Sequence, residues 1–340
     1  RKYPGAPDYL DALIGKADCE ARLGAHSEAI DHFGQAVSDL MDRPPQLRGK
    51  AEDITATVLS HYELNFDRND FTLALDYLSV LRPLYPEELP TRLLEQFAVC
   101  HELIAKQKMA QAESGSTEAG NELSEAAQRM AYQEAHIHFT RAAEHYYKHA
   151  MAVTVADDDA HGESLWQAAA NYDAAQRWGK AIEVYAEFIN GRTSDPRRLE
   201  ATKKLGLSYM ADGQYEPASE LFLSMIQDHP HSPETYACLV PLARCQIAMD
   251  QVDDARRTLM SVVEDHPAIT PDSTQYRDAL IALGRLLYTQ GQREEAIERL
   301  SMAVERYGDS EEGARLKFML ADAYRQSVAD LEETLDEPLS

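Results

Sequence analysis

The chain has no long apolar run, no run of alternating β-branched residues and only four cysteines among its 340 residues. A membrane-spanning helix needs about 18 or more consecutive apolar residues, so we expect no direct insertion into a membrane. A sheet is not expected either, because the alternating pattern of half-buried strands is missing. No Cys-x-x-Cys motif occurs, so we predict that Cys19, Cys100, Cys238 and Cys245 are packing thiols.

The sequence also lacks the motifs of common enzymes. It has no glycine-rich phosphate loop, no Gly-x-Ser-x-Gly and no His-Glu-x-x-His. The segment that begins at Asp157 resembles the start of a calcium loop, but Ala168 stands where the bidentate glutamate is needed, so we interpret it as an acidic helix start. These features predict a protein that is not an enzyme and has no cofactor and no bound metal.

Basic residues are scarce as well. Lysine and arginine number 33 against 58 aspartates and glutamates, which gives a net charge of −25. Such a surface repels phosphate backbones and anionic lipids, so nucleic acid is not expected as a partner. The acidic charge is interpreted either as a well-solvated exterior or as a means of steering a basic partner.

The chain does contain a repeat. Its copies lie at residues 167–193, 204–230, 241–267 and 282–308. The second and third copies align with each other without a gap, and the first copy is less perfect. The second and third copies both end in Asp-His-Pro, at Pro230 and Pro267. Self-similarity at such a period is typical of a solenoid of stacked units.

Each copy has two amphipathic halves separated by a turn. In the second half a small residue is followed four positions later by a large apolar residue, which places both on one face of a helix. These pairs are Ala181 with Tyr185, Ala218 with Phe222, Ala255 with Leu259, and Ala296 with Leu300. Gly213 and Gly291 lie between the halves, where a left-handed helix cap is favourable. The pattern predicts an all-α, superhelical solenoid of antiparallel helix pairs.

These residues resemble the tetratricopeptide repeat (TPR), a helix-turn-helix unit of about 34 residues. The four alanines are 37, 37 and 41 residues apart. This longer form is similar to the repeats of bacterial envelope proteins such as the outer-membrane-assembly lipoprotein and the Tol-Pal coordinator. The resemblance implies a protein-protein interaction scaffold. It also implies a location in the bacterial cell envelope or periplasm, with the cytoplasm as the alternative.

The repeats weaken toward the start of the chain. We predict degenerate TPR-like units at 1–106, a flexible insertion at 107–125 and a C-terminal TPR-like array at 126–340. The insertion is predicted because its sequence is rich in Ala, Ser, Gly and Glu and has no apolar stripe. The preceding helix is expected to end near residue 108, and one uninterrupted first helix is expected at 233–249. The first helix of a final repeat is expected at 311–327, and Val328 to Leu335 are expected to begin the second helix of that repeat.

In arrays of this family the first helices line the concave face, so the resemblance implies a binding groove there. The exposed positions of these helices, offset from core residues such as Leu205 and Gly206, combine aromatic and basic side chains, which are typical anchors of binding surfaces. They are Trp166, Lys203, Leu207, Met210, Arg244, Arg285, Tyr288, Phe318 and Arg325. The predicted partner is a protein or peptide segment that bears carboxylates. The alternative is that the aromatics pack on the next unit and the arginines pair with neighbouring acids.

Two further interpretations remain open. In the first interpretation, the chain is a structural subunit of a homo-oligomer and a sister chain fills the groove. In the second it is a metal-binding module, because His138, His145 and His149 lie seven and four positions apart on one face of a predicted helix.

Overall fold

The computed structural model describes residues 9–43, 49–116, 120–153, 157–264, 266–310 and 312–336. Within these residues the regular structure is helical, apart from one isolated β-bridge between Ser116 and Glu122. The all-α prediction is therefore confirmed. The chain divides into two compact units, Arg1–Val184 and Tyr185–Ser340. The predicted division of the repeats at residues 106 and 125 is a different division, and it remains a proposal.

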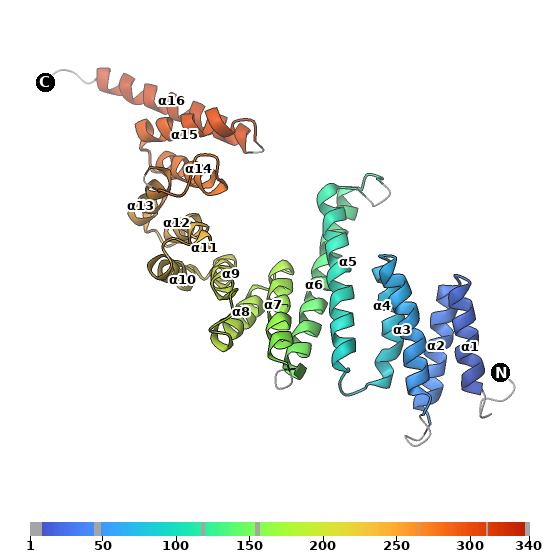
Figure 1. The fold of residues 1–340 in the computed structure, drawn as a ribbon. Helices are drawn as coiled ribbons and strands as arrows, with labels where there is room; N and C mark the ends of the chain where they lie inside the picture. The colour runs from blue at the N-terminus through green and yellow to red at the C-terminus, as the bar shows by residue number, and fades with distance from the viewer. Residues whose placement is uncertain are drawn as a thin grey trace. The chain divides into compact units, whose positions relative to one another are not determined.

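The first unit consists of helix pairs (Figure 1). Its elements are α1 (Tyr9–Arg22), α2 (His26–Met41), α3 (Ala51–Asp67), α4 (Phe71–Leu81), the 3-10 helix η2 (Arg82–Leu84), α5 (Thr91–Ser114), α6 (Glu125–Val153) and α7 (Asp158–Ala174). Helices α1 and α2, α3 and α4, and α5 and α6 pack as neighbours, and α7 packs on α6.

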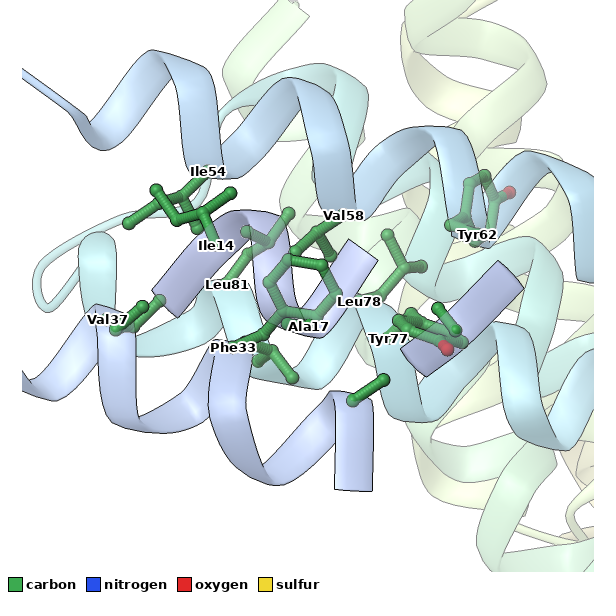
Figure 2. Packing of buried hydrophobic residues seen from close by; sticks show 14 of the residues in the cluster. Ile14, Ala17, Phe33, Val37, Ile54, Val58, Tyr62, Tyr77, Leu78 and Leu81 are labelled. Carbon is green, nitrogen blue, oxygen red and sulfur yellow. The ribbon is translucent and has the colours of Figure 1, made fainter. Parts of the chain in front are cut away.

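One hydrophobic core joins the first four helices, as Figure 2 shows. On α3, Ile54, Val58 and Tyr62 are four residues apart and form a single buried stripe. Phe33 of α2 and Tyr77 of α4 lie in the same cluster and are fully buried. The spacing of the apolar residues thus explains both the helices and the face that each one buries.

The second unit repeats the same arrangement. Its elements are α9 (Arg198–Ala211), α10 (Tyr215–Asp228), α11 (Pro233–Tyr236), α12 (Leu239–Ala248), α13 (Val252–Val263), α14 (Thr274–Thr289), α15 (Arg293–Tyr307) and α16 (Gly313–Asp336), and α8 (Trp178–Gly191) spans the division between the units. Helices α9 and α10, α12 and α13, and α14 and α15 form the packed pairs.

The pairs of small and large residues are buried as predicted. Ala218 and Phe222 are 0% exposed, and so are the equivalent residues of the other three copies. Gly206 of α9 shows how closely the helices approach, because a Cβ atom at this position would lie 2.5 Å from Cε1 of Phe222. Glycine lets the α9 backbone rest directly on the phenylalanine ring.

The turn between paired helices contains one residue in the left-handed conformation. Gly213 and Gly291 have φ angles of 78° and 70°, which confirms the sequence prediction. The same position is held by Gln176 with φ 55° and by Asp250 with φ 60°. A left-handed conformation costs an L-amino acid roughly 1–2 kcal/mol. The geometry of the helix pair, rather than the presence of glycine, therefore imposes this conformation.

Three helix boundaries differ from the sequence prediction. Helix α5 continues through the first part of the predicted insertion to Ser114, and Met109 packs against a small buried cluster that includes Phe139. The helix predicted at 233–249 is interrupted between α11 and α12, because Pro241 has no N–H to donate to the carbonyl of residue 237. Helix α16 is continuous to Asp336, so the prediction that Val328 begins a separate helix is wrong. Residues 117–119 of the insertion lie outside the described residues, and its mobility remains a prediction.

Two smaller predictions concern single residues. The carboxylate of Asp157 caps α7 by accepting a hydrogen bond of 3.0 Å from the backbone N–H of Ala160, in line with the acidic helix start. The thiols of Cys100, Cys238 and Cys245 are buried. Cys19 is exposed, so its prediction as a packing thiol is wrong.

Candidate functional site

The first helices of the second unit form one row. Helices α9, α12, α14 and α16 contact one another in that order. Helices α10 and α13 lie on the other side of this row (Figure 1). Side chains from successive repeats that occupy equivalent positions on the first helices are therefore neighbours.

A pocket of about 710 Å³ opens on this row between α12 and α14. Its wall consists of Arg244 and Ile247 from α12, of Arg277, Asp278, Ile281, Ala282, Arg285, Leu286 and Thr289 from α14, and of Ser310 and Glu312 from the connection that precedes α16. Three arginines face two acids here, which is a local excess of positive charge in a chain whose net charge is −25.

Two of the predicted binding residues, Arg244 and Arg285, lie together in this pocket. Nη2 of Arg285 is 3.2 Å from Oε2 of Glu312. Nε of Arg285 is buried and has no hydrogen-bond acceptor among the described residues. Arg244 is exposed and forms no ion pair with any residue that the structure describes. A buried donor without an acceptor costs about 1–3 kcal/mol, so an acceptor that enters the pocket gains this free energy at Arg285.

Two other predicted residues are joined through a shared acid. Tyr288 of α14 donates a hydrogen bond of 2.7 Å to Oδ2 of Asp322 on α16, and Nη2 of Arg325 donates one of 2.6 Å to Oδ1. The hydrogen bonds from Tyr288 and Arg325 hold the pKa of Asp322 below its usual value. The charge of Arg325 is thus locally balanced, as the alternative interpretation of the strip expects. Phe318 lies on the same helix and is 68% exposed.

The remaining predicted residues differ in exposure. Lys203, Leu207 and Met210 of α9 are half-buried, and the last two pack partly against the cluster around Phe222. Trp166 of α7 is half-buried and belongs to the first unit. Whether it contributes to the same binding surface remains a prediction.

Sequence reasoning missed Arg277 and Glu312 in the pocket wall. Arg277 lies eight residues before Arg285 on α14, so the same helical periodicity, continued for one more turn beyond Ile281, indicates it. Glu312 lies in a connection between two helices, where no periodicity exists to mark it.

The three histidines of the metal-binding alternative point to different helices. The ring of His145 stacks on Phe97 of α5 at 5.3 Å, and His138 also faces α5. Nδ1 of His149 is instead 2.7 Å from Oγ of Ser164 on α7. Among the described residues, no group of three His, Cys, Asp or Glu side chains is arranged to hold a metal ion. The described geometry of these three histidines therefore does not fit the alternative of a metal-binding module.

A buried histidine on the facing helix was not predicted. Nδ1 of His101 on α5 is 2.9 Å from Nδ1 of His138, so one of the two nitrogens donates a hydrogen to the other. Burial, together with the neighbouring His138 and His145, lowers the pKa of His101 to about 3. Burial also lowers the pKa of His138 and of His145. The cluster is therefore neutral at neutral pH.

No helix in the described part of the chain combines the length and the apolar character that crossing a bilayer requires.

Two family models match the second unit. Residues 209–272 and residues 281–330 each match a tetratricopeptide repeat model. The chain therefore contains tetratricopeptide repeats in these two stretches, as the spacing of the small residues predicts. A search of curated protein sequences found no match.

Several solved structures are similar in fold. The tetratricopeptide-like repeats of a putative kinesin light chain from Podosopora anserina have a TM-score of 0.43 at 19% identity, over 64% of this chain and 95% of that one. A tetratricopeptide repeat protein from Parabacteroides merdae has a TM-score of 0.38 at 14% identity, over 93% and 98%. A Rap protein complexed with competence and sporulation factor has a TM-score of 0.43 at 13% identity, over 96% and 90%.

Proposed function

We propose that this protein is a non-catalytic interaction scaffold that binds a protein segment along the row formed by α9, α12, α14 and α16. The observation that carries the proposal is the pocket between α12 and α14, where Arg244 and Arg285 lie together. Arginine presents a planar set of five donors that matches the geometry of a carboxylate, so it is suited to recognise acidic side chains. Ile247 and Ile281 stand beside the arginines and offer apolar contacts. The proposed partner is therefore a segment with carboxylates between aliphatic residues.

Other residues of the row extend this surface on both sides of the pocket. On α9 the proposed contacts are Lys203, Leu207 and Met210, and on α14 and α16 they are Tyr288, Phe318 and Arg325. Phe318 offers the most exposed large apolar side chain of this set. Trp166 lies in the first unit and is proposed as a partner contact of that unit by itself. The central arginines carry most of the binding free energy in this proposal, because anchors in a desolvated pocket contribute more than residues at a solvated rim.

The first test places a photo-crosslinking amino acid at position 247 in the pocket wall. The matched control places it at position 223 on α10, since Leu223 is similarly exposed and lies outside the row of first helices. The proposal expects a crosslinked protein from native lysate at position 247 and not at position 223. Equal capture at both positions, or capture at position 223 alone, contradicts it.

The second test reverses the charge of the pocket with Arg244→Glu and Arg285→Glu in one variant. The control variant carries Arg257→Glu and Arg306→Glu, which reverse two exposed arginines on α13 and α15. We expect the crosslinked partner to bind the control as it binds the wild type. Loss of one arginine from a desolvated charge pair costs about 2–5 kcal/mol, so the pocket variant should lose binding altogether. Circular dichroism checks that both variants are folded, and undiminished binding to the pocket variant overturns the proposal.

A further inference from the structure

The Arg285–Glu312 ion pair assigns a role to Glu312 that goes beyond lining the pocket. We propose that the Glu312 carboxylate occupies the carboxylate subsite as an internal substitute for the ligand, and that a glutamate side chain of the partner replaces it on Arg285. The inference rests on the proposed function. It specifies the chemistry of the ligand and the side chain that pairs with Arg285 when no ligand is bound.

The geometry of Arg285 carries this inference. A carboxylate that binds an arginine side-on accepts hydrogen bonds from Nε and Nη2, which lie on the same edge of the guanidinium. Glu312 contacts Nη2 at 3.2 Å, whereas Nε is buried and has no acceptor among the described residues. Glu312 thus fills one half of a two-point site. A carboxylate that enters the pocket with freer geometry can fill both halves.

Glu312 is also easy to displace. Its side chain is 52% exposed, and exposed ion pairs are weak and screened by salt. Its backbone carbonyl accepts a hydrogen bond of 3.1 Å from the N–H of Leu316, in the first turn of α16. The backbone at this position is therefore already fixed by the helix. Release of Arg285 requires only a rotation of the Glu312 side chain, and the helix can stay in place.

The neighbouring side chains define what replaces Glu312. The substitute is itself a glutamate, so a glutamate side chain has the reach and the charge that this subsite accepts. Ile247, Ile281 and Leu286 line the pocket beside it, which favours aliphatic residues next to the partner's glutamate. Arg277 lies close to Asp278, with Nε 3.1 Å from Oδ1. Arg244 has no ion pair with any described residue, so it is available to a second acidic residue of the partner.

The experiment selects peptides from a displayed library of random 12-residue segments against the whole protein, and then resynthesises the enriched peptides with acetylated and amidated ends. We expect enrichment of a glutamate between aliphatic residues. Change of that glutamate to glutamine should weaken binding by about tenfold or more, because a desolvated charge-assisted pair is lost. Arg285→Lys keeps the charge but removes the two-donor edge, so it should weaken binding by about tenfold.

The decisive variant is Glu312→Gln, which has the same shape and no charge. It removes the competitor, so we expect it to tighten binding of the same peptides by about two- to fivefold, the range that corresponds to a weak exposed ion pair. The control is Glu305→Gln, a substitution of an exposed glutamate on α15 that should leave the affinity unchanged.

The outcomes separate this inference from the proposed function. If Glu312→Gln does not tighten binding, but the double variant Arg244→Glu with Arg285→Glu abolishes it, the internal substitute is overturned and the binding surface stands. If only peptides with a free C-terminal carboxylate bind, the source is a chain end and the glutamate inference is overturned. If the enriched peptides bind the double variant unchanged, or if no peptide is enriched because only a second copy of the chain occupies the pocket, both proposals fail.

Discussion

At position 206 the chain has no room for a side chain. A Cβ atom there would lie 2.5 Å from Cε1 and 2.9 Å from Cζ of Phe222, a ring that is fully buried. We predict that Gly206→Ala lowers the stability by about 1–3 kcal/mol, the usual cost of overpacking a core. At the equivalent Gly284 the nearest atom is a terminal methyl carbon of Leu300 at 3.0 Å, which needs a smaller shift.

The matched substitution Gly284→Ala is therefore the control. Alanine is a better helix former than glycine by roughly 0.5–1 kcal/mol, and this gain offsets part of the smaller clash. Thermal melts of the two variants should show a clear loss for Gly206→Ala and a distinctly smaller change for Gly284→Ala. Equal losses would mean that the two glycines do not differ in the closeness of the helix contact.

The left-handed turn residues allow a prediction in the opposite direction. Gln176 has φ 55° and is exposed, so its side chain gives no contact in a core. We predict that Gln176→Gly stabilises the protein by about 0.5–1 kcal/mol, because relief of left-handed strain exceeds the added entropy of the unfolded chain. Asp250→Gly should gain less, since aspartate tolerates this conformation better. A melting temperature that falls in Gln176→Gly contradicts the prediction.

At the scale of the helices, apolar periodicity was sufficient to predict most of the fold. Pairs of a small and a large residue, such as Ala218 with Phe222, mark the face at which two helices touch. Each of the four copies has such a pair, so the sequence indicates its two packed helices. The break before α12 depends on a single missing N–H at Pro241 inside an otherwise helical pattern. The sequence prediction gave a continuous helix because the apolar pattern continues on both sides of this single missing hydrogen bond.

The candidate site was predictable to the extent that it follows the same periodicity. Arg244 and Arg285 occupy equivalent positions in successive first helices, and stacking of the repeats places them in one pocket. Glu312 and His101 reach their neighbours through tertiary contacts that no spacing in the sequence records. His101 in particular meets His138 across two long helices, 37 residues away in the chain.

The buried His101 at the contact between α5 and α6 predicts that the stability of the fold decreases in acid. His101 has a folded-state pKa of about 3, whereas an unfolded histidine titrates near 6.5. The unfolded state therefore binds the proton first as the pH falls. The contribution of neutral His101 to stability is fully present above pH 6.5 and is lost between that value and about pH 3, with a slope of at most about 1.4 kcal/mol per pH unit.

The variant His101→Gln tests this prediction, because glutamine keeps a hydrogen-bonding side chain beside His138. Urea unfolding measured between pH 7.5 and 4 should show a shallower loss of stability in the variant than in the wild type. His138 and His145, whose pKa values burial also lowers, should retain part of the slope. Identical slopes in both proteins would place the acid sensitivity elsewhere.

Over the whole molecule, two charge effects act at different distances. The chain carries a net charge of −25, which repels an acidic segment while it is still far away. The three arginines of the pocket attract the same segment at contact. The Debye length falls from about 30 Å at 0.01 M salt to about 10 Å at 0.1 M, so salt screens the distant repulsion more than the contact attraction.

This balance predicts an unusual salt dependence for the proposed partner class. Added salt should raise the association rate constant of a peptide with several glutamates, by several-fold between about 0.01 and 0.1 M, whereas complementary partners usually associate more slowly as salt increases. The dissociation rate should change less, because salt screens the contacts inside the pocket less than it screens the distant repulsion. Stopped-flow fluorescence measures both rates, and the glutamine version of the peptide, which carries no charge, should show a flat association rate. An association rate that falls with salt for the acidic peptide would mean that the field of Arg244, Arg277 and Arg285 extends beyond the acidic surface, and that the pocket itself steers the partner.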